Sequence, residues 1–443
     1  MARHLVVDKT QTIDSRDELI YLLCEAASVE HSLMCQYLFC GFSLKVNVSE
    51  GVTDEQMNQI CNWERFILMV ARQEMEHLGL VCNLLSAIGA APYFSHPTFP
   101  YPTSLYRHSM SLDRFSAQTL KKFICFERPR GVDPRHAFCF EPDLQIKGLI
   151  DVVAPSPLPY ETVGELYEAL RRGFENVAKR NSNLFIGPLS TQVTGDELLT
   201  NFVRKGATGG GYDIFMAPVT NLESALKVID LIIHQGEATK VDPKCEEFEL
   251  SHFRVFQRIY CDLLKIRDAH PQFEPARAVV SNPVLYPDAG RPGQTKITDP
   301  NSRAVLDLLD GAYGLMLLLL LRFFSHVDEN KALFEEVRAA AFFPFMTMVI
   351  RPLTEVLTSL PAYEHGGPER AGPSFEVYPN VSLVPHTRSA WRVLYERFEE
   401  LADDAKQISQ RTQMPERVAY IAESLELIRR RLASVLHPLG IPL

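Results

Sequence analysis

Two short patterns in the sequence carry residues whose types and spacing could bind metal ions. Glu74 and His77 are three positions apart, and so are Glu249 and His252. On an α-helix this spacing places both side chains on one face, where a single cation can contact both. Carboxylate oxygens and imidazole nitrogens are ligands that first-row metal ions accept. The two pairs therefore predict a carboxylate-bridged site for two metal ions in a helical bundle.

Apolar residues at helical spacing predict the first two helices, over residues 16–44 and 53–88. A capping-box pattern at Thr53 opens the second of them. Glu30 lies within the apolar stripe of the first helix, where a lone carboxylate is unfavourable unless a charged group meets it. Glu30 precedes the connecting loop by about 15 residues and Glu74 follows it by about 20, at about 1.5 Å per residue. An antiparallel hairpin therefore brings these two acids to similar heights.

A second helical hairpin is predicted further along the chain, from residues 221–239 and 245–266. Glu237 lies shortly before its turn and Glu249 shortly after, so these acids also reach matching heights. One helix of each hairpin then supplies a single Glu, and the other supplies Glu-x-x-His. The predicted metal-ligating and catalytic residues are therefore Glu30, Glu74, His77, Glu237, Glu249 and His252.

Four carboxylates and two imidazoles in a helical bundle are typical of centres that hold two iron or two manganese ions. Carboxylates bridge the cations and offset their charge, while each imidazole completes one coordination shell and leaves positions open for dioxygen. We expect two iron ions, with manganese as the alternative, and dioxygen as co-substrate. On the order of one Glu-x-x-His is expected by chance in a chain of this length, so a single match would be weak evidence. The prediction of a metal site depends on there being two such pairs, each matched in height by a further Glu. His234, three residues before Glu237, remains open as a further ligand.

Composition argues against several other classes of protein. The 443 residues carry a net charge of −10 and no basic run, which disfavours nucleic-acid binding. The apolar run from Gly311 to Leu321 is shorter than the roughly 20 residues of a membrane-spanning helix, so we expect a core helix and no membrane partner. The first residues lack the pattern of a signal peptide. The nine cysteines, Cys261 among them and none in Cys-x-x-Cys, are expected as free thiols in a cytoplasmic protein.

The chain divides into two predicted regions at the Pro/Gly-rich stretch 282–299. Residues 1–280 are expected to form the four-helix bundle, with 92–220 as an inserted loop or lid region that contains helices over 112–126 and 162–180. Residues 295–443 are expected to form a helical region packed on the bundle, with helical patterns at 301–327, 329–360, 387–412 and 415–437. No strong strand pattern is present, so the predicted fold class is all-α.

Several segments between residues 16 and 378 stand out as a set: Val29-Glu-His-Ser-Leu-Met-Cys-Gln-Tyr-Leu38, Ala71-Arg-Gln-Glu-Met-Glu-His-Leu78, Asn83-Leu-Leu-Ser-Ala-Ile-Gly89, Thr162-Val-Gly-Glu-Leu-Tyr167, Gln235-Gly-Glu237, Glu249-Leu-Ser-His-Phe-Arg-Val-Phe256 and Ala371-Gly-Pro-Ser-Phe-Glu376. Together they resemble the ferritin-like domain of iminophenylpyruvate dimer synthases, which are related to enzymes of the violacein and rebeccamycin pathways. The resemblance implies a ferritin-like four-helix bundle with a long crossover, and an oxidative step in secondary metabolism. The chain departs from this family after Gln235-Gly-Glu237, where a second Gly is more usual than Ala238.

The residues and the resemblance together predict a non-haem dinuclear-iron oxidase or oxygenase in secondary metabolism. It would use dioxygen on a small molecule, either amino-acid-derived or an aromatic metabolite. A second class stays open, an enzyme of the iminophenylpyruvate dimer or chromopyrrolate synthase type that couples imines oxidatively, with or without haem. A third is a non-catalytic iron-binding or storage protein, against which the long C-terminal region argues. The expected partner is the small-molecule substrate, and a homodimer is left open.

Overall fold

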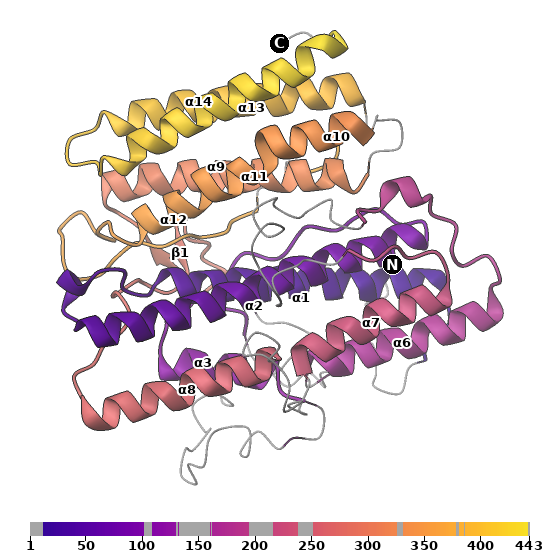
Figure 1. The fold of residues 1–443 in the computed structure, drawn as a ribbon, viewed down its shortest axis with the longest axis horizontal. Helices are drawn as coiled ribbons and strands as arrows, with labels where there is room; N and C mark the ends of the chain where they lie inside the picture. Colours follow the sequence, from indigo (N-terminus) through magenta and orange to yellow (C-terminus); the bar gives the residue numbers. More distant parts are fainter. Residues whose placement is uncertain are drawn as a thin grey trace.

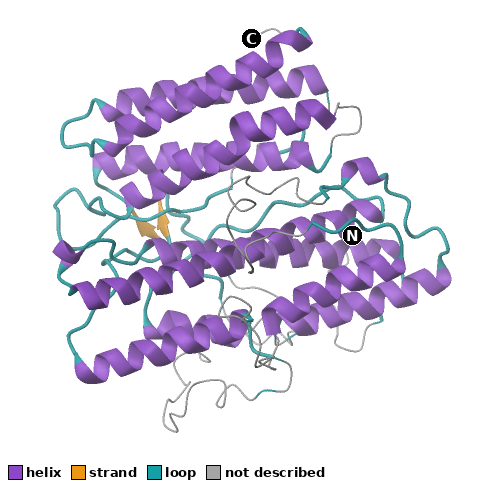
Figure 2. Ribbon diagram, viewed as in Figure 1, coloured by secondary structure: helices purple, strands orange, loops and turns teal. Residues whose placement is uncertain are grey.

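The computed structural model describes residues 12–101, 109–129, 132, 160, 162–194, 216–237, 251–325, 331–377, 381–384 and 386–441. Helices dominate these residues (Figure 2), and the strands among them are the short parallel pair β1 (Pro283–Val284) and β2 (Thr295–Lys296). The helices lie in two tiers, with the N-terminal helices in the lower tier of Figure 1 and the C-terminal ones in the upper. This arrangement confirms the all-α prediction.

The lower tier is built on a hairpin of two long helices, α1 (Arg16–Phe42) and α2 (Asp54–Ala87), which pack along each other. Capping boxes that begin at Ser15 and Thr53 start the two helices, because they satisfy backbone N–H groups that have no partner within the helix. Gly89 follows the end of α2 with a φ of 85°, a left-handed conformation that glycine adopts readily. The first predicted hairpin is confirmed.

Four shorter helices complete the tier: α3 (Ala117–Phe126), α6 (Val163–Arg180), α7 (Leu222–Glu237) and α8 (His252–Ala269). Helix α3 packs along α8, and α6 packs along α7. In Figure 1, α7 and α8 follow each other end to end, and so do α6 and α3. Two interrupted helices therefore lie against α1 and α2 and make a four-helix bundle.

The predicted hairpin of residues 221–239 with 245–266 is wrong. Helices α7 and α8 meet at their facing ends, and each buries its apolar stripe on a helix that the sequence assigned to the inserted region 92–220. Helices α3 and α6 are thus part of the bundle. An apolar stripe shows that a helix has a buried face without showing which helix covers it, so the local pattern was insufficient here.

The upper tier contains α9 (Pro300–Phe323), α13 (Thr387–Ser409), α14 (Arg417–Leu436) and a composite helix over residues 331–357. The composite helix consists of α10 (Lys331–Val337), α11 (Phe343–Phe345) and α12 (Arg351–Leu357), joined by π-helical stretches at Arg338–Phe342 and Met346–Ile350. Pro344 and Pro352 follow these stretches. Proline has no N–H group and clashes with the carbonyl group four residues earlier. The α-helical hydrogen-bond pattern is therefore interrupted there. Single 3-10 turns lie at Val48–Glu50, Leu189–Thr191 and His437–Leu439.

Two predictions about individual features have different outcomes. Helix α9 and the segment Phe334–Leu357 are long and apolar enough to cross a membrane by composition, but 78% of the α9 window is buried within the protein. Helix α9 is therefore the core helix that the sequence predicts. The expectation of free thiols fails at Cys261, which is disulfide-bonded, whereas the described free cysteines are Cys24, Cys35, Cys40, Cys61, Cys82 and Cys125.

Candidate metal centre

Four of the six predicted ligands meet between α1, α2 and α8. Glu30 from α1, Glu74 and His77 from α2, and His252 from the first turn of α8 are each at most 2% exposed. The Nδ1 atom of His77 lies 3.0 Å from Oε2 of Glu74 and 3.6 Å from Oε2 of Glu30. The Nδ1 atom of His252 lies 3.0 Å from Oε1 of Glu74. The structure therefore joins residues from three helices in one buried cluster.

The remaining predicted residues give a different result. Glu249 and the side chain of Glu237 lie outside the described residues, so their role as ligands stays a prediction. The end of α7 does reach the cluster, because Oε1 of Gln235 lies 2.6 Å from Nε2 of His77. His234, which the sequence left open as a further ligand, is exposed on α7 and is not part of the cluster.

A fifth cluster member, Glu127, was missed by the sequence analysis. It follows the last residue of α3, is 1% exposed, and places its Oε2 atom 3.6 Å from Nδ1 of His252. A Cβ atom added at Gly236 would lie 3.4 Å from this oxygen, so α7 closes over the carboxylate. A signal was available: the residues three, four and seven positions before Glu127 are all apolar, as they are for Glu30.

Glu74 divides the cluster into two similar halves. Its two oxygens face His77 and His252, each at 3.0 Å. A terminal carboxylate completes each half at 3.6 Å from the imidazole, Glu30 beside His77 and Glu127 beside His252. Within each half, one potential ligand atom from every residue lies within 4.8 Å of the others. A bridging carboxylate with one terminal carboxylate and one imidazole on either side is suited to a pair of cations.

Residues behind each imidazole orient it toward the centre. The Nε2 atom of His77 pairs with the amide oxygen of Gln235, and that of His252 pairs with the amide oxygen of Gln73 at 3.1 Å. Because an amide oxygen only accepts, each Nε2 donates its hydrogen outward, and each Nδ1 faces the carboxylates. Partners of this kind fix the tautomer and ring orientation of metal-binding histidines.

Two buried tyrosines support the terminal carboxylates in the same manner. The hydroxyl of Tyr167 on α6 donates to Oε1 of Glu30, and that of Tyr37 on α1 donates to Oε1 of Glu127. One oxygen of each carboxylate is thereby satisfied, which leaves Oε2 of each facing its imidazole. The two halves of the cluster therefore share the same outer support.

Burial and charge set the protonation of the metal-free cluster. Burial, with the negative charge of Glu74, raises the pKa of Glu30 to about 8 and also raises that of Glu127. Burial alone would lower the pKa of His252, but Glu74 and Glu127 raise it to about 9. The same opposition, with Glu30 and Glu74 beside the ring, raises the pKa of His77 well above its usual value. Protons therefore occupy positions that cations can take, and metal binding would release them.

Unpartnered atoms test whether these residues fit metal ions. Oε2 of Glu30, Oε1 of Glu74 and Nδ1 of His252 are buried without a hydrogen-bond partner, and all three face the interior of the cluster. An unsatisfied buried polar atom costs about 1–3 kcal/mol, so a ligand is needed to offset this arrangement. Carboxylate oxygens with imidazole nitrogens form the donor set that iron and manganese accept in helical bundles. The residues present therefore fit two such ions.

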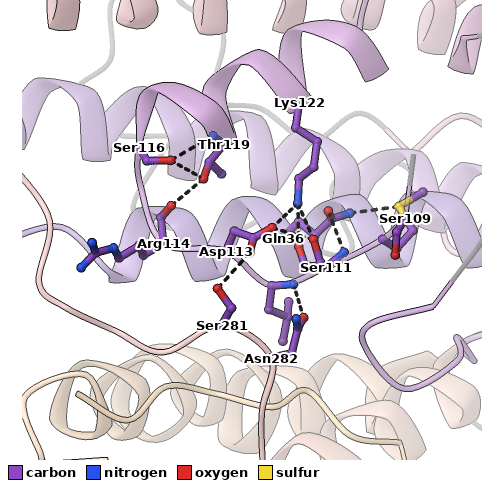
Figure 3. A network of polar contacts seen from close by, with 12 residues as sticks. Gln36, Ser109, Ser111, Asp113, Arg114, Ser116, Thr119, Lys122, Ser281 and Asn282 are labelled. Atoms are coloured by element: carbon purple, nitrogen blue, oxygen red, sulfur yellow. Dashed lines mark hydrogen bonds and ion pairs between the residues drawn. The ribbon is translucent and has the colours of Figure 1, made fainter. Parts of the chain in front are cut away.

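A separate polar network positions the helix that carries Glu127 (Figure 3). The Nζ atom of Lys122 on α3 lies 2.7 Å from Oδ2 of Asp113, and it donates to the carbonyl and hydroxyl oxygens of Ser111 at 2.8 and 2.9 Å. Ser281 donates to the other oxygen of Asp113 at 3.0 Å. These bonds tie α3 to the segment before it and to Ser281, in a distant part of the chain.

The fold and the cluster together define a helical-bundle protein with a carboxylate–histidine centre. Residues 23–261 match the family model described as Ferritin-like, which is more than half of the chain. The chain therefore belongs to the ferritin-like family, and the resemblance drawn from the sequence segments is confirmed.

Individual relatives add detail to this family assignment. The chain is 27% identical over 431 residues to the dichlorochromopyrrolate synthase of Lentzea aerocolonigenes, covering 89% of this chain and 39% of that one. It is 27% identical over 422 residues to the 2-imino-3-(indol-3-yl)propanoate dimerase of Chromobacterium violaceum, covering 89% and 37%. The chain thus spans about two fifths of the length of these relatives. A ferritin-like protein from Caulobacter vibrioides is similar in structure, with a TM-score of 0.41, 20% identity, and coverage of 71% of this chain and 89% of that one.

Proposed function

We propose that this chain is an oxidative enzyme of secondary metabolism in which two iron ions occupy the two halves of the carboxylate–histidine cluster. The observation that carries the proposal is the convergence of five buried side chains, three of which, Glu30, Glu74 and His252, present an inward-facing atom without a hydrogen-bond partner. The names of the two relatives, a synthase of a chromopyrrolate and a dimerase of an imino acid, support an amino-acid-derived imine as substrate. Oxidative coupling of such imines is the reaction class we favour.

Each protein group has a definite role in this proposal. Glu30 and His77 would hold one ion, Glu127 and His252 the other, and Glu74 would bridge them. When bound, a pair of iron ions supplies the capacity to take electrons from a substrate and to pass them to dioxygen. Nearly complete burial of the five ligands excludes bulk water, which strengthens the electrostatic interactions inside the site.

The proposed reaction is consistent with the redox role of this centre. Joining two imine molecules through a new carbon–carbon bond removes two electrons and two protons, so an oxidant is required. Dioxygen is the oxidant we propose, and it would accept the two electrons and two protons that the coupling releases.

Metal content and dioxygen consumption test the proposal directly. The chain would be purified without added metal, analysed for its elements, loaded with ferrous iron under anaerobic conditions, and then mixed with air and an α-imino acid generated from its amino acid. We expect two irons per chain, dioxygen consumption and a coupled product. Glu74→Gln should lose all three, while Glu55→Gln, an exposed position in the first turn of the same helix, should retain them.

Three results would contradict the proposal. Full coupling activity in Glu74→Gln, with metal content equal to that of the parent chain, would exclude the cluster as the reactive centre. Coupling activity accompanied by a Soret band, and independent of iron in the cluster, would instead support the haem-dependent alternative. An iron-loaded chain that consumes no dioxygen with any imino acid would support metal binding without catalysis.

A further inference from the structure

A second group of buried side chains lies beside the carboxylate–histidine cluster and shares no residue with it. His31 and Cys35 occupy successive turns of α1, His96 comes from the segment after α2, and Tyr313 comes from α9. All four are at most 6% exposed. His31 follows Glu30 directly, but adjacent helical residues point about 100° apart, so it faces α9 rather than the carboxylates. We call these four residues the thiol–imidazole cluster.

Distances within the thiol–imidazole cluster are those of a potential metal site. One ligand atom each from His31, Cys35 and His96 lies within 4.8 Å of the others. The Sγ atom of Cys35 is 3.9 Å from Nε2 of His96 and 3.4 Å from the hydroxyl of Tyr313. That hydroxyl also contacts Nε2 of His31. Three elements distant in the sequence therefore direct a thiol, two imidazoles and a phenol to one point.

Hydrogen bonding prepares one imidazole for coordination. Nδ1 of His96 donates to the carbonyl oxygen of Pro97 at 2.8 Å, so Nε2 carries the lone pair that faces Cys35. A backbone carbonyl that receives the outer N–H of an imidazole is the usual support of a metal-binding histidine. The ring is held further by packing against Phe99, with ring centroids 5.1 Å apart.

His31 shows that packing alone does not account for the cluster. Its Nδ1 atom is buried without a hydrogen-bond partner. A histidine that serves only to fill a core would be expected to use both ring nitrogens, since an unsatisfied buried polar atom is unfavourable. The rings of His31 and His96 are in edge contact, with centroids 4.5 Å apart, so neither has room to turn away independently. A bound cation would offset this arrangement.

We propose that His31, Cys35 and His96 bind a single thiophilic cation, zinc or copper(I), beside the hydroxyl of Tyr313. A thiolate with imidazoles is the donor set that these two ions accept, whereas the carboxylate-rich centre suits harder ions. Binding replaces the proton of the Cys35 thiol, which passes to solvent, and no electron transfer is involved. The bound ion would connect α1 to the segment after α2. Because Tyr313 on α9 contacts His31 and Cys35, the site would lie where the bundle meets the C-terminal helices.

Cobalt and copper(I) binding to the metal-depleted chain test this inference. Cobalt replaces zinc in tetrahedral sites and gives a near-ultraviolet thiolate charge-transfer band, and copper(I) can be titrated against a coloured chelator. We expect the cobalt thiolate band to correspond to one ion per chain and one equivalent of copper(I) to bind, and competition between zinc and copper(I) identifies the preferred cation. Cys35→Ser should abolish the cobalt band and weaken binding by more than about 100-fold. Cys40→Ser, an equally buried cysteine on the same helix, should bind as the parent chain does.

Two further measurements separate this site from the carboxylate–histidine centre and from a folding defect. Glu74→Gln should lose iron and retain the cobalt band, while Cys35→Ser should show the reverse. If Cys35→Ser does not fold, X-ray absorption of the cobalt-loaded parent chain decides, because a sulfur ligand at about 2.3 Å is expected. Absence of a sulfur ligand in the parent chain, or an unchanged cobalt band in Cys35→Ser, would overturn the inference.

Discussion

Two polar groups of this protein, a half-buried network around Asp113 and the fully buried carboxylate–histidine cluster, use similar side chains in opposite ways. In the network around Asp113 and Lys122, both carboxylate oxygens accept hydrogen bonds, and the ammonium group has three acceptors (Figure 3). In the carboxylate–histidine cluster, Glu30, Glu74 and His252 each present a buried atom without a partner. The network is complete as folded, whereas the cluster keeps buried atoms without hydrogen bonds that a bound cation could contact.

The difference shows how structural and functional polar groups can be distinguished in a core. Burying a charge is unfavourable unless it is paired and hydrogen-bonded, and the Asp113 network meets that requirement within the chain. The cluster has enough charge and burial to be costly, yet its inward atoms face each other without hydrogen bonds. A fold retains such an arrangement where binding energy offsets it. Each prediction below treats the two groups as a matched pair.

Metal addition should stabilise the protein through the cluster alone. At a free metal concentration about 100 times the dissociation constant, each site adds about 2.7 kcal/mol to the free energy of unfolding. We expect two occupied halves to raise the melting temperature clearly, with Mn²⁺ as a probe that avoids oxidation. Thermal unfolding with and without Mn²⁺, monitored by circular dichroism, measures the effect. Asp113→Asn should show the full Mn²⁺-dependent increase in melting temperature, and Glu74→Gln should show none. An equal increase in Glu74→Gln would contradict the proposed difference between the cluster and the Asp113 network.

Replacing Glu127 should affect one half of the cluster. Glu127→Gln removes the terminal carboxylate beside His252 and leaves Glu30 and His77 in place, so we expect one tight metal site and one weakened about 100-fold, or about 2.7 kcal/mol. Calorimetric titration with Mn²⁺ resolves the two sites. Glu237→Gln is the informative comparison, because the sequence favoured Glu237 as the ligand of this position. Two unchanged sites in Glu127→Gln would return that role to Glu237.

What the sequence could predict of the fold depended on local signals. The capping box at Thr53 and the apolar stripes placed α1 and α2, and the four C-terminal helical patterns match observed helices. A short loop also fixed the pairing of α1 with α2. The pairing of α7 with α6 and of α8 with α3 involves long connections, and no local pattern encodes it.

The residues of the candidate site also fall into those that local sequence spacing could predict and those that only tertiary packing places. Glu74 and His77 form a helical motif, and Glu30 follows from the height of a tight hairpin, so these residues could be proposed from spacing. Glu127 carries no motif, and its place beside His252 is set by tertiary packing of α3 on α8. The thiol–imidazole cluster was missed for a related reason: only His31 and Cys35 share a helix, and their partners come from two distant segments.

Removing the charge of Asp113 should lower stability without changing metal stoichiometry. Asp113→Asn leaves the Lys122 ammonium, 8% exposed, without its charged partner, and we expect a loss of about 2 kcal/mol in the free energy of unfolding. Urea unfolding at pH 7 measures the loss, and metal titration of the same variant should still give two sites. Loss of both sites would show that the network acts on the cluster through α3.

The same variant predicts a pH dependence whose sign follows from the pKa of Asp113. Burial would raise this pKa, but the charge of Lys122 and the hydrogen bonds lower it below its usual value. A depressed carboxyl pKa contributes stability that is present above the unfolded pKa of about 3.9 and is lost as the pH falls through the folded value. The difference in stability between the parent chain and Asp113→Asn should therefore shrink below about pH 4. A constant difference across this range would contradict the assignment.

The smallest expected effect concerns the tyrosines that support the terminal carboxylates. Tyr167→Phe removes the donor to Glu30, and Tyr37→Phe removes the donor to Glu127, with little change in packing volume. We expect each to weaken one metal site about tenfold, or about 1.4 kcal/mol, and to leave the other unchanged. Because burial and the charge of Glu127 raise the pKa of Tyr37 well above 10, its hydroxyl stays a donor at neutral pH.

The control is Tyr395→Phe in the upper tier. The Tyr395 hydroxyl accepts a hydrogen bond from Arg429, and its removal should leave both metal sites intact. If Tyr37→Phe and Tyr167→Phe weakened the same site, the two-half arrangement around Glu74 would be wrong.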